Sequence, residues 1–304
     1  MNALVLGAGG QLGTELVRLL GAESAVPHAA LSITDRAAVE AFIGERRPDV
    51  AFNCAAYNAV DHAEMDPEAA LLVNRDGPEN VALACAAHGV RMVHFSTNFV
   101  FDGALDRPYV ESDRPRPLGR YGFSKLAGER AVQAANPQAI VVRTAAVYGN
   151  IGTGFPDRIV ERARAHGEVE VVTDQFVNPT YARDLADRLL ELPSDLAGVI
   201  HLTGGGCCNW LEFARAALDE AGVVAEVRPL TSAQWSGRAR RPGNGCLEST
   251  RTHALRPWRE ALHEWAMEAK RASKRLGPGD FSLPAPSLAA GGEVLNKDES
   301  RLPF

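Results

Sequence analysis

The sequence predicts an α/β fold: a Rossmann-like, doubly wound parallel sheet with a smaller mixed α/β lobe. The first observation is a short apolar run at residues 3–6 that enters a glycine-rich turn at residues 7–13. The second is the alternation of strand-like and helix-like patterns up to about residue 145, which is typical of βαβ units in a parallel sheet. The third is a less regular alternation after that point, which indicates a second unit.

The elements of the first part follow from the spacing of apolar residues. After the strand at 3–6, Leu12, Leu16, Leu19 and Leu20 recur at helical spacing. A helix around 38–43 ends before Pro48, because the residue before a proline disfavours helical backbone. The further predicted elements are a strand at 50–53, a helix at 78–88, a strand at 91–97, a helix from about Tyr121 and a strand at 139–143. In the second part, we expect helices near 155–165, 182–192 and 210–221, and a strand at 199–202.

The charge balance excludes some partners. The 304 residues carry 32 Lys plus Arg and 38 Asp plus Glu, a formal net charge of -6. No overall positive field results, so we expect no nucleic-acid partner. Apolar runs stay far below the roughly 18 residues of a membrane span, and the N-terminus lacks the features of a secretory signal. We therefore expect no membrane partner and a cytoplasmic location.

The cysteines and histidines predict neither disulfides nor metal. Five cysteines, at 54, 85, 207, 208 and 246, show neither CxxC spacing nor a disulfide framework. We expect reduced, structural thiols, with a redox role for the neighbours Cys207 and Cys208 as the less favoured alternative. The eight histidines show no HxH or HxxxH spacing, so we expect no metal site.

Gly7, Gly10 and Gly13 follow a GxxGxxG spacing between the first strand and the first helix. Such a turn brings backbone N–H groups close to a pyrophosphate at a helix N-terminus, which favours a dinucleotide site over a plain tight turn. The region about 20 residues further on, Ser24 to His28, has no acidic residue for the ribose of NAD and no arginine for a 2′-phosphate. NADPH is slightly favoured over NADH, and the choice stays open.

Tyr121 and Lys125 are spaced to share one face of a helix. The cation is expected to lower the pKa of the phenol, which would make it a proton donor and acceptor for a carbonyl and alcohol pair. Lysine occurs otherwise only at 270, 274 and 297, so a solvated basic face explains the pair less well. Thr97 ends an apolar strand, where ligands of parallel sheets bind, and is expected to hydrogen-bond a substrate oxygen rather than serve only as a turn cap.

Together these features resemble the extended short-chain dehydrogenase/reductase superfamily and, within it, the dTDP-4-dehydrorhamnose reductase family. NCAAYNAVD at 53–61 is similar to the family's NAAAYTAVD, and STNFVFDG at 96–103 to STDYVFDG. YGFSKLAGE at 121–129 matches YGxTKLxGE, DQFVNPT at 174–180 is similar to DQxGxPT, and RRP at 240–242 resembles part of ARRPxNS. These segments occur in the family's order over about residues 1–265.

The resemblance implies an NAD(P)H-dependent reductase that delivers hydride to C4 of a nucleotide-activated 4-keto-6-deoxyhexose, with dTDP as the expected nucleotide. By resemblance Tyr121 protonates the developing alkoxide, Lys125 tunes Tyr121 and holds the nicotinamide ribose, and Thr97 orients the carbonyl. The implied cofactor-binding residues are Gly7, Gly10, Gln11, Leu12, Gly13, Asn53, Ala55, Ala56, Tyr57, Tyr121 and Lys125. Arg240 or Arg241 is expected to clamp the diphosphate, with a solvated surface run as the alternative.

This interpretation divides the chain into three parts. A dinucleotide-binding domain is expected at 1–145, completed by about 171–203, with a substrate-binding lobe at 146–170 and 204–266. A flexible C-terminal tail is expected at 267–304, since Gly, Pro, Ser and Ala dominate from Gly277 without periodicity. The residues leave the oligomeric state open, and a homodimer is implied only by the resemblance, because such enzymes are often dimers.

The chain departs from the family among its expected substrate-binding residues, which are Asn98, Phe99, Ala146, Arg240 and Arg241. Asn98 and Phe99 stand where the family has Asp and Tyr, Ala146 replaces the Trp of RTSWVYG, and Val177 replaces a glycine. We therefore expect a related nucleotide-activated 4-keto sugar rather than 4-dehydrorhamnose itself. The alternatives are a non-catalytic NADP-binding regulatory subunit and an epimerase or dehydratase on the same fold.

Overall fold

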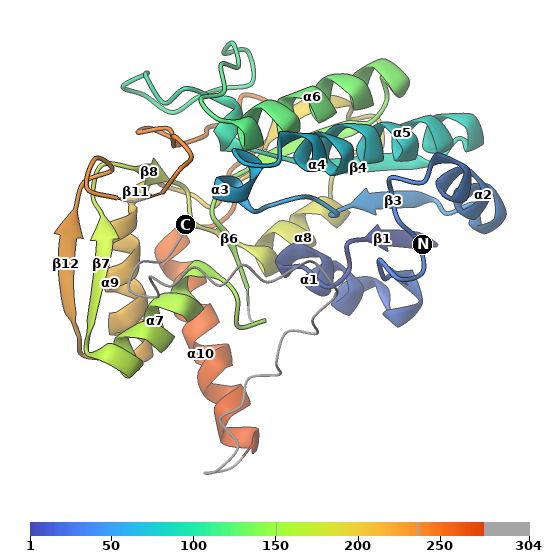
Figure 1. The fold of residues 1–304 in the computed structure, drawn as a ribbon. Coiled ribbons are helices and arrows are strands. Elements are labelled where there is room, and N and C mark those ends of the chain that lie inside the picture. Colours follow the sequence, from blue (N-terminus) through green and yellow to red (C-terminus); the bar gives the residue numbers. More distant parts are fainter. Residues whose placement is uncertain (150, 236, 277–304) are drawn as a thin grey trace.

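The computed structural model describes residues 1–149, 151–235 and 237–276. Its centre is a parallel sheet of six strands in the order β10-β5-β4-β3-β1-β2 (Figure 1). The strands are β1 (Ala3–Leu6), β2 (Ala25–Val26), β3 (Val50–Asn53), β4 (Arg91–Thr97), β5 (Ile140–Thr144) and β10 (Gly198–His201). Each neighbouring pair is parallel, which confirms the predicted fold class. The short strand β2 was not predicted, because two residues carry no readable period.

Helices cover both faces of this sheet, because its strands are apolar on both sides. On one face α1 (Gln11–Leu20) and α8 (Ala182–Leu190) bury Leu16 and Leu185. On the other face α2 (Arg36–Arg46), α5 (Gly77–His88) and α6 (Arg120–Ala135) bury Val39, Val81 and Val132 (Figure 1). The carboxyl ends of the strands are thereby left for ligands and for the second lobe.

The second lobe has a core of its own around the buried Phe213. Its helices are α7 (Phe155–His166), α9 (Trp210–Ala221) and α10 (Trp258–Leu276). They accompany three short strand pairs, which are β7 (Glu168–Val172) with β12 (Glu226–Leu230), β8 (Phe176–Val177) with β11 (Cys208–Asn209), and β6 (Val147–Tyr148) with β9 (Thr180–Tyr181). Strand β7, which contains residue 171, pairs with β12 and so belongs to the second lobe. The chain therefore returns to the sheet domain near α8 (Ala182–Leu190), later than the expected boundary at about residue 171.

The C-terminal residues up to Leu276 are helical and do not form the expected tail. Helix α10 continues to Leu276, so the tail predicted from residue 267 is wrong for its first ten residues. An apolar stripe on α10 is buried in the core of the second lobe and consists of Trp258, Leu262 and Trp265. The sequence analysis did not identify this stripe. Residues 277–304 lie outside the described residues. Within the described ranges, no helix is both long and apolar enough to cross a membrane.

The expectation that every cysteine is a reduced thiol is wrong. Cys207 forms a disulfide with Cys246, which lies 39 residues further along the chain, and not with its neighbour Cys208. Cys54, Cys85 and Cys208 are free. Sequence spacing gave no signal for this pair, because only the folding of the second lobe brings the two cysteines together.

Candidate active site

The glycine turn lies between β1 and β3, at the point where the strand order reverses. Gly7 adopts a left-handed φ of +77°, and a Cβ there would lie 2.6 Å from the Ala55 nitrogen. A Cβ on Gly13 would collide with the carbonyl oxygen of Gly7. These two glycines therefore allow the turn, the start of α1 and the segment after β3 to approach one another closely.

The N-terminus of α1 fits a phosphate group. Its N-cap is Gly10, which supplies no side-chain cap, and its first turn contains no acidic residue. Open space surrounds the Cβ position of Gly9. Uncapped backbone N–H groups at a helix N-terminus favour anions. The turn from Gly10 to Gly13, including Gln11 and Leu12, thus has the donor set that a dinucleotide pyrophosphate requires.

A buried asparagine fixes the predicted cofactor-binding segment after β3. The Asn74 side chain accepts from the Tyr57 N–H at 2.8 Å, and donates to the Tyr57 carbonyl and to the Ser124 hydroxyl, each at 3.0 Å. At the start of the segment, Asn53 accepts from the Ala55 N–H at 3.3 Å. These bonds hold residues 53–57, Ala56 among them, beside the glycine turn.

Asn74 was not singled out from the sequence. It lies in the π-helical turn η2 (Leu72–Asp76), which follows α3 (Val60–Ala63) and α4 (Pro67–Leu71). No helix was predicted over residues 60–76, although Asp66 followed by Pro67 at the first helical position was a readable start signal. The π turn itself depends on packing against α6 and has no sequence pattern of its own.

Thr97 and Tyr121 meet at the carboxyl end of β4. The Tyr121 hydroxyl lies beside the Thr97 side chain and donates to Asn58 Oδ1 at 3.3 Å. Thr97 also accepts from the Phe99 N–H at 3.2 Å, so it caps the short helix η3 (Asn98–Val100) as well. The Phe99 ring packs edge-on against the Tyr121 ring, with centroids 5.5 Å apart. The structure therefore brings the predicted phenol and threonine together, and adds Asn58 as a partner that the sequence analysis missed.

The electrostatic relation of Tyr121 to Lys125 differs from the prediction. Burial raises the pKa of Tyr121 to about 12, although the hydrogen bond with Thr97 opposes this rise. The expected lowering by Lys125 is wrong for this structure, because the Lys125 ammonium donates to the Phe95 carbonyl at 2.6 Å and its charge acts on Cys54 and His94. A phenol with this pKa keeps its proton at neutral pH.

Lys125 lies near the buried ion pair of Glu129 with Arg143. Burial lowers its pKa to about 8, while Glu129 and Cys54 act to raise it. Glu129, one turn further along α6, accepts from Arg143 Nε at 2.9 Å and Nη2 at 2.7 Å, and from the Ser96 hydroxyl at 2.5 Å. Both side chains of the Glu129–Arg143 pair are only 4% exposed. The pair fixes a negative charge near the ammonium, and sequence reasoning did not identify it.

A pocket lies between the end of β4 and the second lobe. Its walls include Asn98, Phe99, Gln175, Val177, Trp210 and Pro242. Asn98 and Phe99 were predicted to contact substrate, whereas Gln175 and Trp210 were not singled out. The Gln175 position was readable, because it belongs to the DQFVNPT segment. Trp210 was read only as the start of a helix.

The remaining predicted substrate residues take different positions. Arg241 lines the same pocket and pairs with Asp61, with Nη2 2.8 Å from Oδ2. Arg240 is exposed. Ala146 is partly buried and adopts a left-handed φ of 44°, and its carbonyl accepts from the Thr180 N–H at 3.2 Å. The structure thus places one arginine at the pocket in an ion pair, so a diphosphate would have to share it with Asp61.

Comparisons with known proteins agree on one family. A family model described as the RmlD substrate binding domain matches residues 1–271. The chain is 43% identical over 278 residues to the dTDP-4-dehydrorhamnose reductase of Mycobacterium tuberculosis, a match that covers 85% of this chain and 90% of that protein. It is 38% identical over 277 residues to the probable dTDP-4,6-dihydroxy-2-methyloxan-3-one 4-ketoreductase of Streptomyces antibioticus, covering 87% and 94% respectively.

A solved structure supports membership of the same family. The dTDP-4-dehydrorhamnose reductase of Bacillus anthracis in complex with NADP superposes with a TM-score of 0.84. The two chains are 32% identical, and the match covers 88% of this chain and 98% of that one. The similarity therefore extends over both the sheet domain and the second lobe.

Proposed function

Because the chain belongs to the RmlD substrate binding domain family, we propose that it reduces the C4 ketone of a dTDP-linked 4-keto-6-deoxy sugar with NADPH. The observation that carries the proposal is the buried Tyr121 phenol, which lies beside Thr97 at the carboxyl end of β4 and donates to Asn58 Oδ1. Two similar proteins bear the names of dTDP-sugar reductases, and the similar Bacillus anthracis structure holds NADP, which supports the substrate class and the cofactor.

Tyr121 acts as the general acid. Its pKa of about 12 keeps the phenol protonated at neutral pH, so the phenol can give its proton to the oxygen that gains charge during reduction. When the ketone is bound, the Thr97 hydroxyl turns its proton from Asn98 Oδ1 to the same oxygen and orients the carbonyl. Donors that are already in place stabilise charge as it develops in the transition state. The nicotinamide, when bound, supplies the hydride.

The other cofactor-side residues bind and orient. The Lys125 ammonium gives one N–H to the Phe95 carbonyl and has two further donors for the hydroxyls of the nicotinamide ribose. Gly7, Gly10, Gln11, Leu12 and Gly13 hold the pyrophosphate at the start of α1. Asn53, Ala55, Ala56 and Tyr57 form the adjoining wall, which Asn74 fixes.

The substrate side favours a sugar other than 4-dehydrorhamnose. The Nδ2 group of Asn98 is already engaged within the protein, since it donates to the Gly245 carbonyl at 3.0 Å. Phe99 and Ala146 offer no hydrogen-bonding side chain. Asn98, Phe99 and Ala146 stand where the family has a carboxylate, a hydroxyl and an indole, so a related sugar is favoured, and the Streptomyces antibioticus relative, whose name specifies another dTDP-linked ketone, supports this choice.

Anaerobic incubation with dTDP-4-keto-6-deoxyglucose and either NADPH or NADH tests the proposal, with and without an epimerase. We expect cofactor oxidation, faster with NADPH, and a product whose C4 stereochemistry is read by NMR. A panel of other 4-keto sugar nucleotides then identifies the preferred sugar. No cofactor oxidation with any member would favour a non-catalytic regulatory subunit. Efficient turnover of dTDP-4-dehydrorhamnose alone would contradict the role given to Asn98, Phe99 and Ala146.

The turnover number is expected to fall as pH rises through about 8. Burial has lowered the pKa of Lys125 to about 8, so its ammonium is lost above that pH, whereas Tyr121 keeps its proton up to about 12. The measurement is a profile of kcat from neutral to alkaline pH. In Lys125→Arg, whose guanidinium stays charged, the decline should disappear even though the rate is lower. A decline at the same pH in the arginine variant would assign it to another group.

A further inference from the structure

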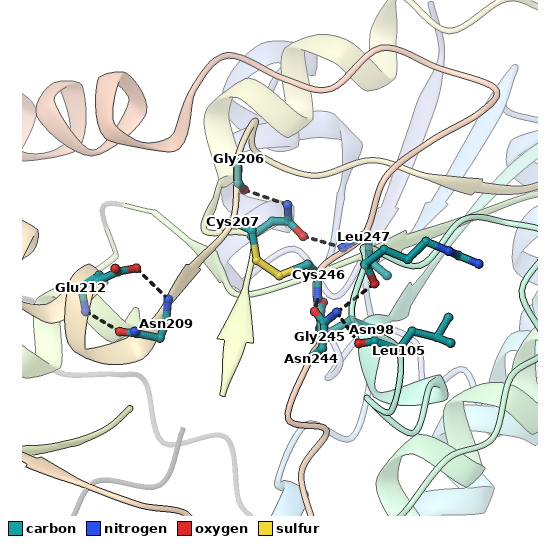
Figure 2. Close-up of a disulfide and its surroundings, with 12 residues drawn as sticks. Asn98, Leu105, Gly206, Cys207, Asn209, Glu212, Asn244, Gly245, Cys246 and Leu247 are labelled. Atoms are coloured by element: carbon teal, nitrogen blue, oxygen red, sulfur yellow. Dashed lines mark hydrogen bonds between the residues drawn. A yellow bond between two sulfur atoms is a disulfide. The ribbon is translucent and has the colours of Figure 1, made fainter. Parts of the chain in front are cut away.

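The Cys207–Cys246 disulfide joins two segments beside the substrate pocket. Cys207 directly precedes β11, and Cys246 follows Pro242, which lines the pocket, by four residues. The two Cα atoms are 6.0 Å apart, and Figure 2 shows the bond crossing between the two segments. Cys207 is exposed, whereas Cys246 is buried. The disulfide is thus within reach of a reagent in solution on one side only.

Strand β8 lies between the two linked segments. On one side it pairs with β11, where Val177 faces Cys208. On the other side the Phe176 N–H donates to the Gly243 carbonyl and the Gly245 N–H donates to the Phe176 carbonyl, each at 2.8 Å. The disulfide therefore closes a small unit of three adjacent segments, 207–209, 176–178 and 243–247.

The side chain of Asn178 makes a second, non-covalent connection across this unit. Its Oδ1 accepts from the Leu247 N–H at 2.7 Å, and its Nδ2 donates to the Gly206 carbonyl at 2.8 Å. Gly206 and Leu247 are the direct chain neighbours of the two cysteines. The amide and the disulfide thus join the same segments in parallel.

The clamped segment also carries a carbonyl on which the pocket depends. Gly245, next to Cys246, accepts the 3.0 Å hydrogen bond from Asn98 Nδ2. A Cβ on Gly245 would collide with that amide, so the two groups are in close contact. Asn98 lines the pocket and accepts from the Thr97 hydroxyl. The position of segment 243–247 therefore sets the position of Asn98.

We propose that the Cys207–Cys246 disulfide is a reducible clamp that positions the substrate-side wall of the pocket through Gly245 and Asn98. The bond is cleaved by a dithiol. One thiolate attacks the Cys207 sulfur and forms a mixed disulfide, and the Cys246 sulfur leaves and takes a proton. The second thiolate of the reagent then closes the reagent's own disulfide, and the Cys207 sulfur leaves and takes a proton. Two electrons and two protons pass to the cysteines.

The neighbouring Cys208 does not compete in this exchange. It is buried in the core of the second lobe, whereas Cys207 is exposed. Burial also raises the pKa of its thiol to about 12, which leaves little thiolate to attack a disulfide. Cys208→Ala is therefore a matched control, because it removes a thiol next to the clamp but leaves the clamp intact.

The first test compares binding in the oxidised and the reduced chain. Thiol titration in denaturant should count three thiols after treatment with oxidised glutathione and five after dithiothreitol, corresponding to the three free cysteines and to all five. Calorimetry then measures the affinity for dTDP-glucose, which has a hexose but no ketone, and separately that for NADPH. Loss of the clamp should weaken dTDP-glucose binding by about 10-fold, the scale of one hydrogen bond, and leave NADPH affinity unchanged.

Variants distinguish a positioning role from a general loss of stability. Cys207→Ser and Cys246→Ser should resemble the reduced chain and no longer respond to dithiothreitol, whereas Cys208→Ala should respond like the wild type. Asn178→Ala removes the parallel connection, so the response to dithiothreitol should become larger. Five thiols after oxidation, or equal dTDP-glucose affinity in both states, would overturn the proposal.

The ligand in this test rests on the proposed function, so a second readout is independent of it. Hydrogen exchange followed by mass spectrometry should be faster in peptides covering 243–247 and 206–209 after reduction, and unchanged over the glycine turn. Faster exchange without dTDP-glucose binding in either state would support the clamp and contradict the proposed substrate. Unchanged exchange over 243–247 would overturn the clamp whatever the ligand.

Discussion

Replacing Tyr121 by phenylalanine is expected to lower kcat by about 10²–10⁴-fold, the usual contribution of a positioned general acid. The loss arises because no other described side chain in the neighbourhood of Thr97 is placed to give a proton to the substrate oxygen. The Asn58 amide accepts from the phenol, and the Lys125 ammonium donates to the Phe95 carbonyl. The measurement is steady-state kcat with NADPH and the preferred keto sugar nucleotide.

The phenylalanine variant changes the hydroxyl group without changing the packing of the ring. It keeps the edge-on contact with Phe99 and removes only the hydroxyl. NADPH affinity, dTDP-glucose affinity and the urea midpoint of unfolding should therefore stay close to those of the wild type. Thr97→Val, which keeps the branched shape of the side chain, should lower kcat by a smaller factor, because it removes orientation and not the proton. A phenylalanine variant with nearly unchanged kcat would contradict the assigned acid.

The sequence predicted the features that depend on local pattern. The glycine turn, the strand that ends at Thr97 and the helix that carries Tyr121 and Lys125 lie where alternation and spacing placed them, because each is written within a few adjacent residues. The family motifs were equally informative: membership is confirmed by the match over residues 1–271. Even the departures at Asn98 and Phe99 fall on the walls of the pocket.

The features that the sequence did not predict depend on tertiary contacts. The shared helix face of Tyr121 and Lys125 was readable, but the burial that raises one pKa and lowers the other was not. The same is true of the Cys207–Cys246 disulfide, whose partners are 39 residues apart, and of β7, whose partner β12 follows only after α9. Spacing along the chain carries little information about such pairs.

Breaking the buried Glu129–Arg143 pair is expected to have the largest effect on stability. Either single variant, Arg143→Met or Glu129→Leu, should lose about 3–5 kcal/mol of unfolding free energy, because each leaves one charge buried without its counterion. The remaining partners do not replace the direct ion pair: without Arg143, Glu129 keeps the Ser96 hydroxyl and the charge of Lys125. Without Glu129, Arg143 keeps its contacts with His201 and the Phe101 ring. Urea unfolding at neutral pH measures these losses.

The double variant Glu129→Leu with Arg143→Met separates the charges from the packing. Apolar side chains of similar size remove both desolvation penalties, so its loss should be far smaller than the sum of the two single losses. Glu129 also raises the pKa of Lys125, so removing the carboxylate should move the alkaline decline of kcat below its position near pH 8 even in a stable double variant. Additive stability losses would show that the charges do not compensate each other. A decline that stays in place would show that Glu129 stabilises the fold without acting on Lys125.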